Sequence, residues 1–221
     1  MPKDKLKIGV LASTRGTDLQ AIIDEIEQGK LDAEVSVVIS DRPDAYALER
    51  ARKHGIEAIF IDPKGKTREE FDREVMKILD EKQVDVVALI GYMRILSKEF
   101  VRKYKNRIMN VHPSLLPAFA GGMDKNVHKA VLDYGVKVTG CTIHFVDETV
   151  DGGPIILQAA VPVEEDDTVD TLKEKVQALE KKLYPEALRL FHEGRLKIEG
   201  RRVRILPKKK NAGKKSTNNS S

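Results

Sequence analysis

The chain has 221 residues, of which 41% are hydrophobic and 33% charged, an ordinary balance for a soluble globular protein. No apolar run approaches the roughly 20 residues that span a bilayer, and a single cysteine excludes an internal disulfide framework, so we expect a cytoplasmic protein with no membrane contact. The net charge of +4 would be −1 without the five lysines between residues 207 and 221, which argues against nucleic-acid binding by the folded part.

Strand-like and helix-like segments alternate in the first half of the chain. Apolar runs predict strands at residues 6–12, 35–40, 58–61, 84–90 and 108–111. Helical spacing of apolar residues predicts helices at 17–28, 45–54, 68–82 and 98–104. This alternation favours an α/β fold of Rossmann-like type, with an open, mostly parallel sheet and helices on both faces.

The pattern changes after a further helix predicted at residues 126–134. Long strands at 136–146 and 154–163, joined by a turn at Asp151-Gly152-Gly153, indicate an antiparallel C-terminal extension of the sheet.

A long amphipathic helix is then predicted at 168–192, and Pro185 is expected to kink or divide it. Short strands at 196–198 and 203–205 would form a hairpin. Residues 207–221, rich in Lys, Asn, Ser and Gly, are expected to be a disordered basic tail that serves as a solubilising end or a weak polyanion contact.

Ligands of open parallel sheets bind at the carboxyl ends of the strands, so the loop after the first strand is a candidate site. Gly16 permits close approach of a phosphate to the start of the next helix, and Ser13, Thr14, Arg15 and Thr17 could add donors. Neither a dinucleotide nor an NTP fingerprint is present. A plain helix cap stays an alternative, because residues 17–20 also fit a capping box.

Asn110 and His112 stand two residues apart at the end of a strand, so both side chains point to the same side. Imidazole can shuttle protons near neutral pH, and an amide can donate to the oxyanion of a tetrahedral intermediate, so the pair suits acyl transfer. The alternative is that both are polar caps on a strand end.

Asp151 has two readings, as a turn former or as a carboxylate near His112 that favours the imidazolium. His144 is expected to be structural, and Cys141 to pack in the core. No ligand spacing supports a metal site.

Four segments of the chain carry a resemblance to a known family. They are Gly91-Tyr92-Met93-Arg94-Ile95-Leu96, Asn110-Val111-His112-Pro113-Ser114-Leu115-Leu116-Pro117, Thr142-Ile143-His144-Phe145-Val146 and Asp151-Gly152-Gly153-Pro154-Ile155-Ile156-Leu157-Gln158. In this order they resemble the folate-dependent formyltransferases, and within them the branch that acts on glycinamide ribonucleotide. The likeness runs from about residue 7 to 205.

This resemblance implies the formyltransferase fold and a single domain at 1–206, with a nucleotide-binding half to about residue 105 and a folate and catalytic half from 106. It implies transfer of the formyl group of 10-formyltetrahydrofolate to the amine of glycinamide ribonucleotide, in purine biosynthesis, by a monomer or homodimer that needs no metal. The implied catalytic residues are Asn110, His112 and Asp151. The implied folate contacts are Arg68, Met93, Arg94, Ile95, Leu96, Asn110, Asp147, Glu148, Thr149, Val150 and Asp151. The implied nucleotide contacts are Gly16, Thr17, Asp18, Glu180, Lys181, Lys182 and Leu183.

Two segments depart from the family pattern. The first loop usually reads Gly-x-Gly-Ser-Asn, whereas here it is Thr14-Arg15-Gly16-Thr17-Asp18. The carboxylate of Asp18 would face unfavourable charge beside a phosphate, while Arg15 could compensate. The family's Pro-Gly-x-His-x-His stretch is replaced by the slightly longer segment 120–128, so the loop over the site is expected to differ.

Three rival functions share the motifs. A formyltetrahydrofolate hydrolase would use the same trio with water as acceptor but usually carries an N-terminal regulatory domain. A methionyl-tRNA formyltransferase usually carries a C-terminal barrel, for which the tail is too short. A non-catalytic folate- or nucleotide-binding protein would not require the complete trio.

Overall fold

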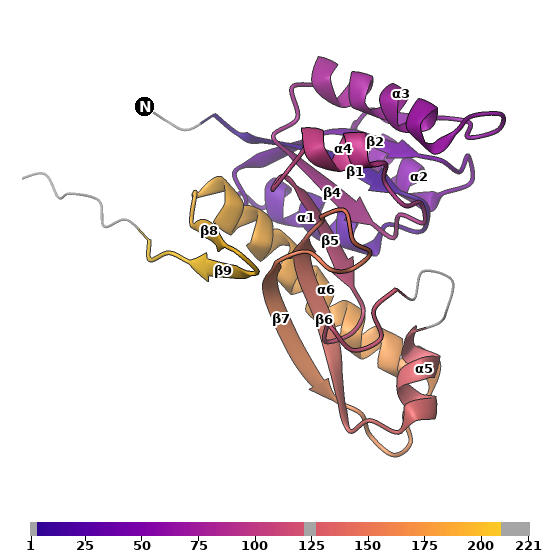
Figure 1. Ribbon diagram of the computed structural model, residues 1–221, viewed down its shortest axis with the longest axis vertical. Coiled ribbons are helices and arrows are strands. Elements are labelled where there is room, and N and C mark those ends of the chain that lie inside the picture. Colours follow the sequence, from indigo (N-terminus) through magenta and orange to yellow (C-terminus); the bar gives the residue numbers. More distant parts are fainter. Residues whose placement is uncertain (1–3, 122–126, 209–221) are drawn as a thin grey trace, which may run out of the picture.

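A mixed sheet of nine strands crosses the part of the chain that the computed structural model describes, residues 4–121 and 127–208. The strand order is β3-β2-β1-β4-β5-β6-β7-β9-β8 (Figure 1). Neighbours from β3 to β5 are parallel, whereas β5, β6 and β7 are antiparallel to one another. The strands are β1 (Leu6–Ala12), β2 (Ala33–Ser40), β3 (Ala58–Phe60), β4 (Val86–Ile90), β5 (Ile108–His112), β6 (Val138–Phe145), β7 (Ile155–Pro162), β8 (Leu196–Glu199) and β9 (Arg202–Ile205).

Helices pack on both faces of this sheet. They are α1 (Thr17–Glu27), α2 (Tyr46–Lys53), α3 (Arg68–Glu81), α4 (Lys98–Lys103), α5 (Val127–Tyr134) and α6 (Val169–His192). One buried cluster joins the sheet to α1, α2 and α6, and a second joins it to α3 and α4. The α/β fold with an antiparallel extension is therefore as the sequence predicts. None of the described helices is long and apolar enough to cross a membrane.

The alternation of side chains along β1 explains why two separate cores form. Ile8 and Val10 point to the α1 and α6 side, while Leu11 points to the α3 side. Each is fully buried. A strand covered on both faces needs apolar residues at every position, which is why β4 is a continuous apolar run and β1 has no polar residue after Lys7.

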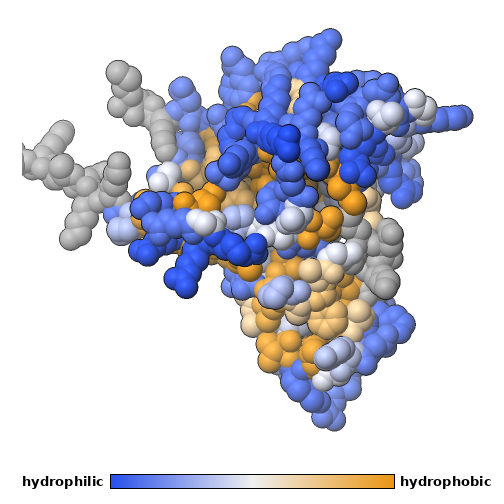
Figure 2. Space-filling view, in the orientation of Figure 1, coloured by the Kyte–Doolittle hydropathy of each residue, from blue (hydrophilic) through white to orange (hydrophobic). Residues whose placement is uncertain are grey.

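The antiparallel extension has a different environment. In Figure 1, β6 and β7 lie in front of α6 with no helix over them in this view. Figure 2 shows hydrophobic residues gathered over the same strands, whereas the surface over α2 and α3 is hydrophilic. The predicted hairpin of β8 and β9 is confirmed, and it extends the sheet beyond β7.

Helix α6 runs unbroken through Pro185, so the prediction that this proline divides the helix is wrong. Burial of Tyr184, Ala187 and Leu188 against the sheet holds the helix on both sides of the proline. The missing Pro185 N–H would have bonded the carbonyl of Lys181, an exposed residue. Tertiary packing thus overrides the local penalty.

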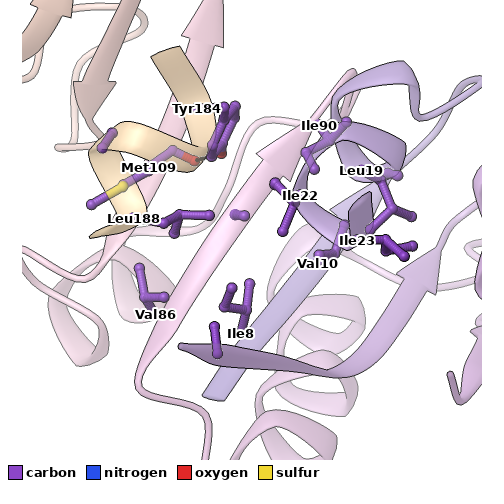
Figure 3. Close-up of a cluster of buried hydrophobic side chains, with 14 of the residues drawn as sticks. Ile8, Val10, Leu19, Ile22, Ile23, Val86, Ile90, Met109, Tyr184 and Leu188 are labelled. Atoms are coloured by element: carbon purple, nitrogen blue, oxygen red, sulfur yellow. Dashed lines mark hydrogen bonds between the residues drawn. The ribbon is translucent and has the colours of Figure 1, made fainter. Parts of the chain in front are cut away.

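Tyr184 is the polar centre of this packing (Figure 3). Its side chain is fully buried, and its hydroxyl donates to the carbonyl oxygens of Met109 and Leu89 at 2.8 and 3.1 Å. These bonds connect α6 to the ends of β5 and β4, the strands that carry the candidate site.

A Tyr184→Phe variant should therefore be less stable by about 1–2 kcal/mol, because a buried hydroxyl bond is lost without a change in packing. Urea unfolding measures the loss, and Tyr134→Phe, which alters an exposed ring on α5, is the matched control. Equal stability of the two variants would show that the Tyr184 hydroxyl does not connect the layers.

The predicted basic tail at 207–221 lies outside the described residues, except for Pro207 and Lys208. Residues 122–126 of the predicted loop at 120–128 also lie outside them.

Candidate active site

Two pockets flank the carboxyl ends of β4 and β5, the edge where a parallel sheet is expected to bind ligands. The loop pocket lies between the segments 92–96 and 146–151, and the helix pocket lies between α1, α5 and α6. Leu89 and Asn110 line the loop pocket, whereas the next residues, Ile90 and Val111, line the helix pocket. Because successive strand residues face opposite ways, the strand ends form a rim between the two pockets.

His112 and Asp151 meet at this rim, although 39 positions separate them in the chain. Nδ1 of His112 lies 3.3 Å from a carboxylate oxygen of Asp151, and the two side chains are only 7% and 9% exposed. Nε2 of His112 is 3.0 Å from the carbonyl oxygen of Phe119, which can only accept. Both ring nitrogens therefore face acceptors, an arrangement that suits an imidazolium held by a buried carboxylate.

Asn110 is oriented by a second histidine. His144 lies opposite Asn110 in the β5–β6 ladder, and its Nδ1 is 2.8 Å from the carbonyl oxygen of Phe145. Nδ1 must therefore carry the hydrogen, which leaves Nε2 to accept from the Asn110 amide nitrogen at 3.2 Å. Burial lowers the pKa of His144, in agreement with a neutral ring. One amide hydrogen of Asn110 is thus fixed on His144 and the other is left for the pocket.

Asp151 is held in place by its backbone. The residue has a left-handed φ of 52°, which aspartate tolerates better than most residues. Gly153 follows where an added Cβ would lie 1.8 Å from the carbonyl oxygen of Phe145, so only glycine lets the turn close against β6. The carboxylate also accepts the backbone N–H of Gly121 at 2.9 Å. Asp151 is thus both turn former and partner of His112, and the two readings of the sequence do not exclude each other.

A His144→Phe variant tests whether His144 positions Asn110. It keeps the ring volume but removes the acceptor, so kcat should fall about tenfold, or about 1.4 kcal/mol, through loss of amide orientation. A ligand of the helix pocket, which His144 does not line, should keep its affinity. Thr139→Val, at another buried polar position on β6, controls for folding. An unchanged kcat in His144→Phe would leave this histidine only a structural role.

The loop pocket combines an apolar floor with unsatisfied polar atoms. Its lining consists of Leu89, Tyr92, Arg94, Ile95, Leu96, Val101, Asn110, His144, Val146, Asp147, Glu148, Thr149, Val150 and Asp151. The hydroxyl of Tyr92 and Nε of Arg94 are buried without a hydrogen-bond partner in the part of the chain described. Such a pocket suits a flat ring system that carries hydrogen-bonding groups at its edge.

The predicted folate contacts fall into two groups in the structure. Those from the segments 94–96 and 147–151, together with Asn110, line the loop pocket. Met93 is 44% exposed and Arg68 lies exposed at the start of α3, and neither is part of that lining. Ser13 accepts the N–H of Met93 at 3.0 Å, so the 92–96 segment is tied to the end of β1.

The start of α1 differs from the capping box considered above. The cap residue is Gly16, with a left-handed φ of 66°, and no side chain caps the helix. An added Cβ at Gly16 would lie 2.8 Å from the Cβ of Ala47, so packing of α1 on α2 fixes this glycine. The alternative of a capping box at residues 17–20 is therefore wrong, and α1 begins beside the helix pocket, which Thr17 and Asp18 line, without a side-chain cap.

The helix pocket is lined by residues from five elements and the adjoining loops. They are Thr14, Thr17, Asp18, Ile90, Gly91, Val111, Pro113, His128, Lys173, Gln177 and Glu180. Among the predicted nucleotide contacts, Thr17, Asp18 and Glu180 lie here. Lys181 and Lys182 are exposed and Leu183 packs against the core, so these three do not line the pocket.

Sequence reasoning missed several residues of this pocket. The missed residues include Lys173 and Gln177, which lie seven and three positions before Glu180 and so share its face of α6. The implied role of Glu180 could therefore have identified both. His128, the second residue of α5, had no such signal, because its position depends on how α5 packs against α6.

Cys141 is buried on β6, and burial raises the pKa of its thiol to about 12. Its predicted place in the core is confirmed.

Comparison with known proteins gives one consistent relationship. The sequence model of a family described as formyl transferase matches residues 6–188. The phosphoribosylglycinamide formyltransferase of Escherichia coli strain K12 is 43% identical over 194 residues, covering 87% of this chain and 90% of its own length. The trifunctional purine biosynthetic protein adenosine-3 of Bos taurus is 46% identical over 195 residues. The match covers 88% of this chain but spans only 19% of the length of that relative. The crystal structure of glycinamide ribonucleotide transformylase 1 from Symbiobacterium toebii has a TM-score of 0.89 and 53% identity, covering 92% of this chain and 95% of that one.

Proposed function

Because the chain belongs to the formyl transferase family, we propose that it transfers the formyl group of 10-formyltetrahydrofolate to the amine of glycinamide ribonucleotide, in purine biosynthesis. The products are formylglycinamide ribonucleotide and tetrahydrofolate. The observation that carries this proposal is the meeting of Asn110, His112 and Asp151 at the rim between two pockets. The printed names of the relatives at 43% and 53% identity support the choice of acceptor.

The two pockets would hold the two substrates. The loop pocket, with its apolar floor and polar rim, suits the folate ring, which would bond with Arg94 and the 147–151 segment. The helix pocket suits the nucleotide, because the uncapped start of α1 favours a phosphate. Holding both substrates end to end across β4 and β5 supplies much of the rate through positioning.

The trio would then act on the carbonyl between the pockets. As the amine nitrogen forms its bond to the formyl carbon, the free amide hydrogen of Asn110 and the Nε2 hydrogen of His112 donate to the developing oxyanion. The formyl oxygen replaces the carbonyl of Phe119 as the acceptor for His112.

The proton transfer completes the reaction. His112 passes its proton to the folate nitrogen, the bond between that nitrogen and the formyl carbon breaks, and the neutral imidazole takes up, directly or through water, the proton that the amine loses. Asp151 keeps the imidazolium in place throughout. This scheme requires no metal, no ATP and no covalent enzyme intermediate. The enzyme would be a cytoplasmic monomer or homodimer, with residues 1–206 as its single domain.

The test is turnover with 10-formyltetrahydrofolate in the presence and absence of glycinamide ribonucleotide. We expect tetrahydrofolate to form only with the nucleotide, in equal amount to the formylated product, as mass spectrometry of both reports. Formate release without the nucleotide would instead indicate a hydrolase. Binding of both compounds without reaction would indicate a non-catalytic binding protein.

A further inference from the structure

One wall of the loop pocket, the segment 92–96, is neither helix nor strand. It connects β4 to α4, and four of its residues line the pocket: Tyr92, Arg94, Ile95 and Leu96. The two polar groups that are buried without a partner among the described residues of this pocket, the Tyr92 hydroxyl and Nε of Arg94, belong to it. Such a segment has no ladder or helix bonds, so other groups must hold it in one place.

Ser13, the residue directly after β1, holds the start of this segment. Its Oγ accepts the N–H of Met93 at 3.0 Å, and its own N–H donates to the carbonyl oxygen of Gly91 at 3.2 Å. The side chain is only 3% exposed. Gly91 also packs against the next residue of the same loop, because an added Cβ would collide with Oγ1 of Thr14. The loop after β1 is therefore both bonded to and packed against the first residues of the wall.

Asp41, the first residue after β2, fixes the direction of the Ser13 hydroxyl. Oγ of Ser13 donates to a carboxylate oxygen of Asp41 at 2.6 Å. A hydroxyl has one hydrogen and two lone pairs, so the hydrogen on Asp41 leaves a lone pair for the Met93 N–H. A charged acceptor makes the stronger bond, so the carboxylate holds this orientation against rotation of the hydroxyl.

A second carboxylate holds the other end of the wall. Asp72 on α3 is 1% exposed and accepts the N–H of Ser97 at 2.6 Å. Ser97 in turn caps α4 through the N–H of Phe100. Burial raises the pKa of the Tyr92 hydroxyl, and the charges of Asp72 and Asp41 raise it further, so both carboxylates act on a group that lines the pocket.

We propose that Ser13 and Asp41 act together as positioning residues of the folate site, although neither lines the loop pocket or the helix pocket. Asp41 orients the Ser13 hydroxyl, and Ser13 holds the backbone from which Tyr92 and Arg94 project. Because Asp72 fixes the far end of the wall, loss of the Ser13 bond frees only the part that carries these two groups. The inference rests on the proposed function, since it takes the loop pocket as the folate site.

Loss of this positioning should weaken folate binding rather than slow the chemical step. The catalytic trio is held by bonds to β6 and to the N–H of Gly121, and none of these involves the segment 92–96. Substrate and transition state would lose the same contacts with the wall. The Michaelis constant for 10-formyltetrahydrofolate should therefore rise about tenfold, as for one lost buried hydrogen bond, while kcat stays nearly constant.

The first experiment does not depend on activity. Amide hydrogen exchange is measured by ¹⁵N NMR in ligand-free wild type, Ser13→Ala and Ser36→Ala, the control on β2 whose hydroxyl bonds to the Glu34 side chain. We expect the Met93 N–H to exchange about tenfold faster in Ser13→Ala, while that of Ser97 keeps its rate. The control should change neither. Unchanged exchange at Met93 in Ser13→Ala would overturn the proposal.

The second experiment measures kcat, both Michaelis constants and the urea midpoint of Asp41→Ala, Asp41→Asn and Asp44→Ala. Alanine removes the acceptor of the Ser13 hydroxyl, so the folate Michaelis constant should rise about tenfold, whereas asparagine keeps an oxygen acceptor and should rescue it. Asp44→Ala is the matched control, because it removes an exposed carboxylate of the same loop that pairs with Arg42.

Two results would contradict the proposal. One is a loss of stability in Asp41→Ala without a change in the folate Michaelis constant, which would leave Asp41 a structural role alone. The other is an equal rise in Asp41→Ala and Asp41→Asn, which would show that orientation of the Ser13 hydroxyl is not what matters. Absence of turnover in the wild type would contradict the proposed function instead, and the exchange rate of Met93 would then decide whether Ser13 holds the wall.

Discussion

A His112→Ala variant that folds like the wild type should lose formyl transfer by about 10²–10⁴-fold, the range found for a positioned acid or base. The ring is buried at the rim between the two pockets, with Nδ1 on Asp151 and Nε2 on a carbonyl that substrate would replace. His144 cannot take over, because it is bonded to Asn110 and burial lowers its pKa. Stopped-flow or steady-state turnover with saturating substrates measures the loss.

Because His112 is 5% exposed, alanine also leaves a cavity, and the loss must be separated from misfolding. A His112→Gln variant keeps a polar group of similar size without a titrating proton, and should lose about as much. Unfolding curves and nucleotide binding show whether each variant keeps its structure. Near-wild-type turnover by either folded variant would remove His112 as the proposed acid.

An Asp151→Asn variant should transfer the formyl group roughly 10²–10³-fold more slowly, equivalent to about 3–4 kcal/mol of transition-state stabilisation. The substitution keeps the shape and one oxygen acceptor but removes the charge that faces the imidazolium at 3.3 Å. The pair is nearly buried, so solvent screens little of this interaction.

The matched control is Asp133→Asn, which removes an exposed carboxylate on α5 that pairs with Lys129. It should leave kcat and both Michaelis constants unchanged. A loss in Asp151→Asn confined to the folate Michaelis constant would contradict a role in proton transfer, because it would indicate a contact that binds substrate and transition state equally.

The sequence predicted the scaffold well because its signals are local. Strand β1 was placed at Leu6–Ala12 from one apolar run, and the period of two along β5 placed Asn110 and His112 on one side. The glycine turn after Asp151 marked the connection of two long strands. Each of these follows from residues close together in the chain.

The contact between His112 and Asp151 had a different origin. It depends on the register of β5, β6 and the turn after β6, which no local pattern fixes. From the residues alone it was one of two readings of Asp151, and the resemblance to a family favoured it. The structure confirms the proximity, while the catalytic role stays a prediction.

Local rules failed where tertiary contacts decide. Thr17 matched a helix cap, but packing of Gly16 on Ala47 moved the cap one residue earlier. Pro185 matched a helix break, but burial of its neighbours holds α6 together. His144 was expected to be structural, and the structure adds that it bonds Asn110 across the ladder, a partner that a strand histidine alone does not reveal.

The most direct measurement of the central claim compares His112→Ala, Asp151→Asn and the double variant in single-turnover formyl transfer. If the imidazole and the carboxylate act as one unit on one bound carbonyl, the double variant should be no slower than His112→Ala alone. Losses that multiply in the double variant would show that the two side chains act independently, and would contradict the mechanism.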